Sequence, residues 1–219
     1  MTVSPPYSES TRDQLLRGLY LILDSAWAPH CSLEDVLQKA VEAGVRIVQY
    51  RDKSNSMQEA YERAKVLRAI APRGKMLFIV NDRCDLALAV DADGVHLGQE
   101  DLPVALARRI VGKKLLIGLS THTIEQVRAA TMTEWPDYLG FGPIFPTATK
   151  AQHDPVVGIE GLSRIRPLTT LPVFAIGGIM PPIVSRLREV GADGVAVASG
   201  ILGATNRQES FRQFMDPFI

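Results

Sequence analysis

Short apolar runs rich in β-branched residues alternate along this chain with stretches in which apolar residues recur at helical spacing. Ile183, Val184, Leu187 and Val190, for example, share one face of a helix. Alternation of this kind predicts a parallel sheet whose strands are joined by crossover helices. The predicted strands are Leu19–Leu23, Val45–Tyr50, Met76–Val80, Gly94–Leu97, Leu115–Leu119, Tyr138–Phe141, Val173–Ile176 and Gly194–Ala198.

These strand and helix units follow one another between residues 18 and 219, with no linker-like or low-complexity stretch between them. The organisation predicts one α/β domain, a single (β/α)8 TIM barrel at the short end of that fold's size range. Residues 1–17 are mixed polar and are expected to form an N-terminal tail or a short helix. A doubly wound open sheet is the alternative, but no G-x-G-x-x-G motif follows the first strand.

Local signals mark the ends of the helices. Ser32–Asp35, Ser56–Glu59 and Thr123–Gln126 have the spacing of a capping box, in which a hydroxyl accepts a backbone N–H and the later side chain reaches back. The phrase Ala-Asp-Gly-Val occurs at 92–95 and 192–195, where small residues suit a left-handed turn into a buried strand. Trp135-Pro136-Asp137 replaces this phrase before the sixth strand.

The composition is that of an ordinary globular protein, with 46% hydrophobic and 22% charged residues. Lys plus Arg number 24, as do Asp plus Glu, so no charge excess predicts binding to nucleic acid or to an anionic membrane. No apolar run approaches the roughly 18 residues that cross a bilayer. The cysteines, Cys31 and Cys84, form no C-x-x-C motif, which argues against a disulfide scaffold or a zinc site and fits a reduced cytoplasm.

In a βα barrel the functional side chains follow the carboxyl ends of the strands. The second predicted strand runs into Gln49–Lys53, where alternation sends Gln49, Arg51 and Lys53 to one side, a set suited to a phosphate or diphosphate. A solvated charged turn is the alternative. The long loop 142–150, after the sixth strand, is expected to be a lid whose Lys150 reaches a leaving phosphate, unless it is an ordinary surface loop.

Acidic residues follow two neighbouring strands. Asp82 comes after the third strand and Asp101 after the fourth, and carboxylate oxygens at adjacent strand ends favour a Mg²⁺ site completed by water and phosphate oxygens. Helix capping by the same two residues is the alternative. His96 is expected inside the barrel rather than on a metal.

The remaining strand ends offer donors. Ser120 is a candidate donor to a substrate oxygen, and His122 is either an acid or base or a partner of the helix that Thr123 caps. Gly177-Gly178 and Ser199-Gly200 follow the seventh and eighth strands, which commonly form a phosphate cradle from backbone N–H groups. The strand ends therefore predict one anionic group at this cradle and a second one near the cations.

Several of these segments, taken together and in order, resemble the thiamine-phosphate synthase family. The resemblance spans about Leu19 to Leu202 and rests on these motifs: Gln49–Lys53, Val80–Asp82, Gly94–Asp101, Gly142–Lys150 and Ala198-Ser199. It implies a (β/α)8 transferase that joins 4-amino-2-methyl-5-pyrimidinylmethyl diphosphate to 4-methyl-5-(2-phosphoethyl)thiazole, forming thiamine phosphate and releasing pyrophosphate.

The resemblance also implies a role for each matching position. It assigns Mg²⁺ to Asp82 and Asp101 and implies that the catalytic residues are Arg51, Lys53, Ser120 and Lys150. The three cations among them would neutralise the developing pyrophosphate. The pyrimidine diphosphate is assigned to Gln49, Tyr50, Arg51, Asp52, Lys53, Asn81, Ser120 and Lys150. The thiazole phosphate is assigned to Thr147, Thr149, Gly178, Ala198 and Ser199. The family is understood to ionise the diphosphate before the thiazole nitrogen attacks, so no side-chain nucleophile is required.

Two other functions stay open from the sequence. A thiazole tautomerase on the same barrel would use a base such as His122 and would not need the diphosphate and Mg²⁺ groups. A non-catalytic binding protein of the thiamine pathway would not need intact acids and cations on several strand ends. The expected partners are small-molecule substrates rather than nucleic acid or membrane, and the sequence leaves open whether the chain forms a homo-oligomer.

Overall fold

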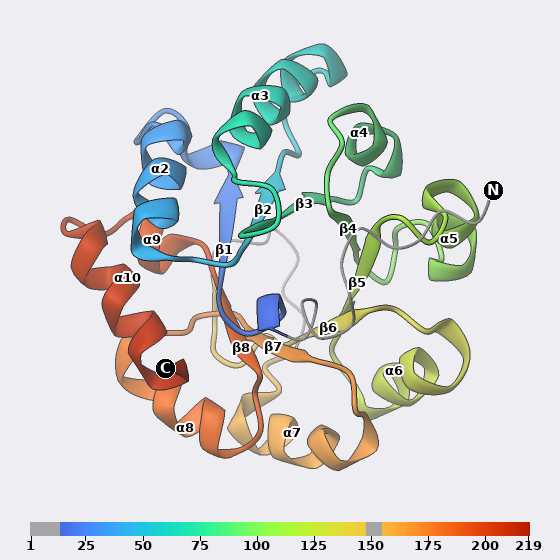
Figure 1. The fold of residues 1–219 in the computed structure, drawn as a ribbon. Helices are drawn as coiled ribbons and strands as arrows, with labels where there is room; N and C mark the ends of the chain where they lie inside the picture. The colour runs from blue at the N-terminus through green and yellow to red at the C-terminus, as the bar shows by residue number, and fades with distance from the viewer. Residues whose placement is uncertain (1–13, 148–154) are drawn as a thin grey trace.

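The computed structural model describes residues 14–147 and 155–219 of the chain. Within those residues the parallel strands pair in sequence order and the last pairs with the first, which closes a barrel inside a ring of helices (Figure 1). The strands are β1 (Gly18–Asp24), β2 (Ile47–Arg51), β3 (Leu77–Asn81), β4 (Gly94–Leu97), β5 (Leu116–Thr121), β6 (Tyr138–Phe141), β7 (Val173–Ile176) and β8 (Gly194–Val197). The (β/α)8 prediction is confirmed, and the open-sheet alternative is wrong because β1 pairs with both β2 and β8.

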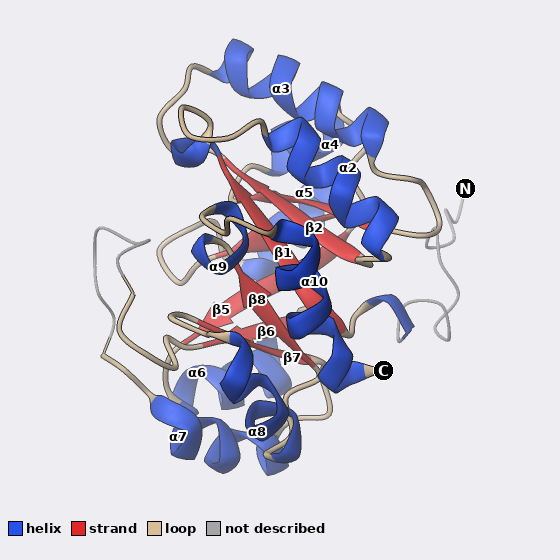
Figure 2. Cartoon of the chain, turned by 90° about the vertical axis from the view of Figure 1, so that its left-hand side faces the viewer, coloured by secondary structure: helices blue, strands red, loops and turns tan. Residues whose placement is uncertain are grey.

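The helices lie outside the strands in both views (Figures 1 and 2). The α-helices are α2 (Leu33–Ala43), α3 (Met57–Ile70), α4 (Cys84–Ala89), α5 (Val104–Val111), α6 (Ile124–Ala129), α7 (Gly158–Ile165), α8 (Val184–Glu189), α9 (Ser199–Leu202) and α10 (Arg207–Met215). Single turns η1 (Ser25–Trp27), η3 (Arg166–Leu168), η4 (Pro181–Ile183) and η5 (Asp216–Phe218) and a π-helical segment η2 (Ala130–Glu134) complete the connections. Among the described residues, no helix is both long and apolar enough to cross a membrane.

The predicted strands agree closely with the observed ones. Three have identical bounds, and β2, β3 and β5 continue past the apolar run to Arg51, Asn81 and Thr121. The extension arises because the backbone ladder continues there; Asp24 of β1, for instance, is in register with Arg51 of β2. The strands therefore carry these polar residues to the edge of the barrel as part of rigid elements.

Side chains alternate between two apolar layers along the strands. On β1, Leu19, Leu21 and Leu23 pack outward against the helices, whereas Tyr20 and Ile22 point into the barrel. Leu15 and Leu16, which precede β1, belong to the inner cluster and are buried there. Leu15 and Leu16 of the predicted tail therefore pack with the barrel interior, and residues 1–13 of that tail lie outside the described residues.

An aspartate before β4, β6 and β8 ties strands together in the same way each time. The Asp93 carboxylate accepts the backbone N–H of Phe78 and pairs with the Arg68 guanidinium at 2.6 Å. The same contacts join Asp137 to Ile117 and Arg108, and Asp193 to Val173 and Arg166. The Ala-Asp-Gly-Val phrase and its Trp-Pro-Asp substitute therefore share one function, which is to link neighbouring strands at their amino ends.

The helix starts follow the capping signals. Ser56 with Glu59 and Thr123 with Gln126 form reciprocal capping boxes. Ser32 accepts from the Asp35 N–H, but its hydroxyl donates to Glu34, so that helix has a side-chain cap without the reciprocal bond.

Candidate active site

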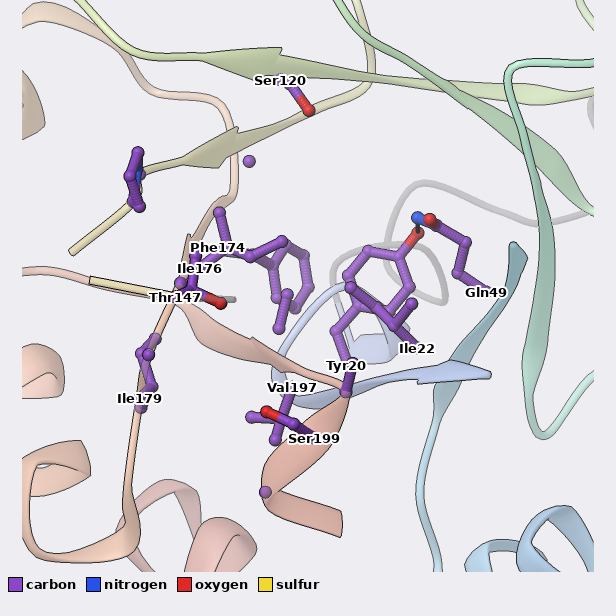
Figure 3. A pocket seen from close by; sticks show the side chains of 18 of the residues that line it. Tyr20, Ile22, Gln49, Ser120, Thr147, Phe174, Ile176, Ile179, Val197 and Ser199 are labelled. Atoms are coloured by element: carbon purple, nitrogen blue, oxygen red, sulfur yellow. Dashed lines mark hydrogen bonds between the residues drawn. The ribbon is translucent and has the colours of Figure 1, made fainter. Parts of the chain in front are cut away.

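A cavity of about 550 Å³ opens at the carboxyl ends of the strands (Figure 3). Its floor is apolar and aromatic, formed by side chains that include Tyr20, Ile22, Phe174 and Ile176. The predicted site residues that line it are Gln49, Arg51, Asn81, Ser120, Thr147, Gly178, Ala198 and Ser199. The strand ends thus bring together residues that are up to 150 positions apart in the sequence (49 to 199).

Arg51 is held over the cavity by a residue that the sequence did not single out. Its guanidinium lies 2.5 Å from the Asp24 carboxylate, which is buried at the end of β1 and also accepts the Ala26 N–H. Because an arginine with one face anchored keeps its other N–H groups in a fixed fork, the pair pre-positions Arg51 for an anion. The signal was present in the sequence, since Asp24 directly follows the first apolar run.

Tyr50 and Asp52 are not among the cavity-lining residues. Tyr50 lies in the layer between strands and helices, and its hydroxyl donates to Asp52 at 2.6 Å. Burial acts to raise the pKa of Asp52, but hydrogen bonds from Asn55, Tyr50 and the backbone outweigh it and lower the pKa to about 2. The structure therefore places Tyr50 in the outer layer of β2 and Asp52 in the loop that precedes α3, and neither lines the cavity.

Lys53, Asp82 and Asp101 form a cluster beside the cavity. The Lys53 ammonium pairs with Asp82, whose side chain is also hydrogen-bonded to Asp101. Burial and the neighbouring Asp101 raise the pKa of Asp82, whereas the shared hydrogen bond helps to lower that of Asp101 against the effect of burial. A cation bound between the two carboxyl groups would offset their mutual repulsion.

Neither acid caps a helix, so the capping alternative is wrong. The N-cap residues of α4 and α5 are Arg83 and Pro103, and neither cap has a side-chain hydrogen bond. Asp101 instead accepts the Gly98 N–H at 2.7 Å, and Asp82 has a left-handed backbone conformation with φ 60°. Hard oxygen donors at two adjacent strand ends fit a Mg²⁺ ion, which keeps several waters beside one or two carboxylates. Among the described residues, no third His, Cys, Asp or Glu joins them.

The two histidines at the cavity have defined partners. His96 is buried inside the barrel, as expected, with Nδ1 3.1 Å from the Tyr138 hydroxyl and Nε2 3.0 Å from the Ser120 hydroxyl. His122 Nδ1 lies 2.5 Å from the Gly142 carbonyl oxygen, which can only accept, so Nδ1 carries the proton. Gln126 caps the turn by accepting the backbone N–H groups of His122 and Thr123.

Glycines after β7 allow the β6 loop to approach the cradle. Gly177 and Gly178 have φ of 96° and 63°, and a Cβ on Gly178 would lie 2.6 Å from the Pro146 carbonyl oxygen. Thr147 and Ser199 lie on one side of the cavity, opposite Gln49 (Figure 3), and Gly178 also lines the cavity. In α9 the N–H groups of Ile201 and Leu202 both donate to the Ala198 carbonyl, so backbone donors to a phosphate would come from Ser199 and Gly200 ahead of them.

Thr149 and Lys150 lie outside the described residues, so their predicted contacts with phosphates remain predictions.

Comparisons with known proteins agree on one family. A family model described as thiamine monophosphate synthase matches residues 19–201. The chain is 43% identical to the thiamine-phosphate synthase of Chloroflexus aurantiacus over 195 residues, which is 89% of each chain. It is 41% identical to that of Methanospirillum hungatei, with 92% of this chain and 98% of the relative covered.

Solved structures give the same result. Thiamine phosphate pyrophosphorylase from Pyrococcus furiosus is similar with a TM-score of 0.83 and 37% identity, covering 94% of this chain and 96% of that one. Orotidine 5'-phosphate decarboxylase from Pyrococcus horikoshii, at 13% identity and a TM-score of 0.66, shares the fold alone.

Proposed function

The chain belongs to the thiamine-phosphate synthase family, and we propose that the cavity at the carboxyl ends of its barrel is where it forms thiamine phosphate. The reaction joins a pyrimidinylmethyl diphosphate to a thiazole phosphate and releases pyrophosphate. The observation that supports this site most directly is that predicted groups for both substrates line a single cavity. Gln49, Arg51, Asn81 and Ser120 come from one part of the barrel, and Thr147, Gly178 and Ser199 come from another.

The pyrimidine diphosphate is assigned to the side where the cations are. Arg51, anchored by Asp24, and Lys53, beside Asp82, offer charge to the diphosphate oxygens. Their attraction for the leaving pyrophosphate grows as negative charge collects on it. The preplaced cations therefore lower the activation barrier to cleavage of the C–O bond, and no covalent enzyme intermediate is needed. Tyr50 and Asp52 support this side through the loop that carries Lys53, because Asp52 also accepts the N–H groups of Ser54 and Asn55.

Asp82 and Asp101 are proposed to hold Mg²⁺. The paired carboxyl groups supply the hard oxygen donors that such an ion prefers, and the ion, when bound, would supply positive charge for the diphosphate. In the structure, the Lys53 ammonium pairs with the Asp82 carboxylate. When Mg²⁺ and the diphosphate bind, the flexible Lys53 side chain can turn from that carboxylate to the diphosphate. The thiazole phosphate is assigned to Gly178, Ala198 and Ser199, with Thr147 from the β6 loop beside them.

A coupling assay with both substrates, with and without Mg²⁺, tests the proposal. Thiamine phosphate should accumulate only when both substrates and the ion are present. Asp82→Ala and Asp101→Ala should each weaken the Mg²⁺ dependence of turnover without unfolding the barrel, which circular dichroism would verify. Unchanged half-saturation by Mg²⁺ and unchanged turnover in both variants would remove the acids from the metal site.

The same assay separates the other two functions. A tautomerase would convert a non-aromatic thiazole phosphate in the absence of the diphosphate, and this conversion would be lost in His122→Ala. A binding protein would retain both ligands without turnover. The free thiols of Cys31 and Cys84 are compatible with the cytoplasm, where we place the reaction.

A further inference from the structure

Asp24 and Arg51 form an ion pair at the carboxyl ends of two neighbouring strands. They are in register, Asp24 on β1 and Arg51 on β2, so their side chains project to the same side of the sheet. Arg51 lines the cavity, whereas Asp24 is 2% exposed and is not among the lining residues. A ligand in the cavity can therefore contact Arg51 without contacting Asp24.

The Asp24 carboxylate is itself held in place. Its Oδ1 accepts the backbone N–H of Ala26 at 3.0 Å, in the single turn η1, and its Oδ2 lies 2.5 Å from Nη1 of Arg51. Burying a carboxylate is costly unless it is paired and hydrogen-bonded, and here each oxygen has a partner. The backbone turn thus fixes the acid, and the acid fixes the arginine.

Other Asp–Arg pairs of the barrel use their arginines differently. At the amino ends of the strands, Arg68, Arg108 and Arg166 each pair with an aspartate and also donate to backbone carbonyl groups. Among the described residues, by contrast, no backbone carbonyl accepts from Arg51, whose hydrogen-bond partner there is Asp24. A guanidinium has five N–H donors, so most of those on Arg51 stay available to a ligand.

The pair has two opposing effects on a diphosphate in the cavity. The negative charge of Asp24 lies beside the guanidinium and repels the diphosphate, which weakens binding. The same carboxylate keeps a long side chain in one orientation, so Arg51 need not reorder as charge collects on the leaving pyrophosphate. Loss of Asp24 should therefore affect turnover and binding in different ways.

We propose that Asp24 is a positioning residue for the coupling reaction: it acts through Arg51, and it lowers affinity for the diphosphate while fixing the guanidinium at the leaving group. The group that Arg51 recognises is a pair of diphosphate oxygens, which the planar fork of N–H donors can bind together. The inference rests on the proposed function, because it takes the cavity beside Arg51 as the diphosphate site.

Asp24→Asn in the full-length protein tests the proposal. Asparagine keeps an oxygen for the Ala26 N–H but loses the charge that holds Arg51. We expect the single-turnover rate, with both substrates and Mg²⁺ saturating, to fall about tenfold. Inorganic pyrophosphate, titrated by calorimetry with Mg²⁺ present, should bind at least as tightly as it does to the unmodified protein. An unchanged rate, or an affinity that falls as far as the rate, would overturn the inference.

A double-mutant cycle shows whether Asp24 acts through Arg51. In the Arg51→Gln background, Asp24→Asn should cause no further loss of rate, because no guanidinium remains to be held. Equal losses in the two backgrounds would contradict the inference, since Asp24 would then act independently of Arg51.

Asp137→Asn is the matched control. It neutralises the acid of an amino-end pair, in which Asp137 lies 2.6 Å from Arg108 and is also largely buried. This variant should lose stability but keep the single-turnover rate and the pyrophosphate affinity of the unmodified protein. A fall in rate like that of Asp24→Asn would overturn the inference, because loss of any such pair would then slow the reaction.

Two further variants keep the test decisive if Asp24→Asn does not fold. Asp24→Ser also removes the charge, and its hydroxyl can accept from Ala26, so it replaces Asp24→Asn in both experiments. Arg51→Lys retains a charge that can pair with Asp24 but has no planar fork, so its rate should fall about tenfold. A full rate in Arg51→Lys would show that a fixed fork is unnecessary and would reject the role of Asp24.

Failure of the proposed function gives a different result. If the unmodified protein forms no thiamine phosphate from the two substrates, the proposed function fails and the inference falls with it. If thiamine phosphate forms, but Arg51→Gln changes neither the rate nor the pyrophosphate affinity, the proposed function stands. Only the assignment of Arg51 and Asp24 to the diphosphate is then rejected.

Discussion

At the scale of single residues, the site depends on contacts that hold charges and glycines in fixed places. Asp24 anchors Arg51, and Asp82 engages Lys53, so both cations near the cavity are paired with acids in the structure. Gly178 lets the β6 loop lie against β7 at a distance that no side chain would permit. The chemistry proposed for the cavity therefore depends on positioning rather than on a reactive nucleophile.

Gly178→Ala tests the cradle. The added methyl group meets the Pro146 carbonyl oxygen and strains a left-handed backbone, so Thr147 and the backbone donors should move apart. We expect the KM for the thiazole phosphate to rise about tenfold, the effect of losing roughly one hydrogen bond to a charged group. The KM for the pyrimidine diphosphate should change little. Equal effects on both substrates would contradict the assignment of the cradle.

Gly44→Ala is the control for Gly178→Ala. Gly44 has a similar backbone conformation, with φ 82°, but nothing within 4 Å of the added Cβ, and it ends α2 away from the cavity lining. It should lower stability through backbone strain and leave both KM values unchanged.

Lys150→Ala tests the one predicted catalytic cation that lies outside the described residues. If Lys150 stabilises charge on the leaving pyrophosphate, its contribution grows as the C–O bond breaks, and the loss appears in turnover rather than in affinity. We expect the single-turnover rate, measured with both substrates saturating, to fall roughly a hundredfold, which corresponds to an activation barrier about 3 kcal/mol higher. Lys150→Arg should restore part of the rate. An undiminished rate would show that Arg51, Lys53 and the Mg²⁺ site stabilise the leaving pyrophosphate without Lys150.

At the scale of elements, three aspartates join pairs of strands at the amino ends of the barrel, far from the cavity. The Asp93–Arg68 pair is almost fully buried, with side chains 5% and 6% exposed, whereas Asp193 and Arg166 are 30% and 25% exposed. Removing one partner of a buried pair leaves an uncompensated charge, and the penalty falls as water reaches the site. The contacts of Asp93, Asp137 and Asp193 are thus alike in geometry but unequal in their contribution to stability.

Asp93→Ala should lower the free energy of unfolding by about 3–5 kcal/mol, and Asp193→Ala by less, because its Arg166 partner remains partly hydrated. Urea titrations give both values. Glu189→Ala removes an exposed partner of Arg186 and serves as a surface control, with an expected loss of about 0–1 kcal/mol. If Asp93→Ala lowers the free energy of unfolding no more than the control does, the contacts of Asp93 do not stabilise the barrel.

At the scale of the whole molecule, the residues that stabilise the barrel at its amino end lie apart from the substrate cavity at its carboxyl end. Leu15 and Leu16 fill the inner cluster from the amino end, while the cavity opens at the carboxyl end. Because the strands between them are rigid and fully paired, we expect damage at the amino end to reduce stability without altering the substrate site.

Leu16→Ala tests this separation. Leu16 is 2% exposed, so its truncation should cost about 2–5 kcal/mol of unfolding free energy. Turnover measured well below the unfolding midpoint should equal that of the unmodified protein. Leu88→Ala makes the same change on the exposed side of α4 and should have little effect on either quantity. Turnover that falls with Leu16→Ala in fully folded protein would show that the two ends are coupled.

Much of the barrel could be predicted from the sequence because its signals are local. The apolar runs, the helical faces and the capping residues act over a few positions, and each strand begins or ends within two residues of its predicted place. The polar residues after those runs were also predicted as site residues, since every parallel strand delivers its carboxyl end to the same face. Gln49, Arg51, Ser120 and Ser199 line the cavity for this reason.

Only the tertiary structure decided which of these residues meet. The side chains of Arg51 and Lys53 pair with acids at the carboxyl ends of other strands. Tyr50 turns outward because successive residues of a strand face opposite sides, and Tyr20 meets Tyr138 across 118 positions. Pairs so distant leave no periodic signal, because their contact depends on barrel closure and on the register of every strand between them. Local pattern determined the elements and their polar ends, and closure determined the partners.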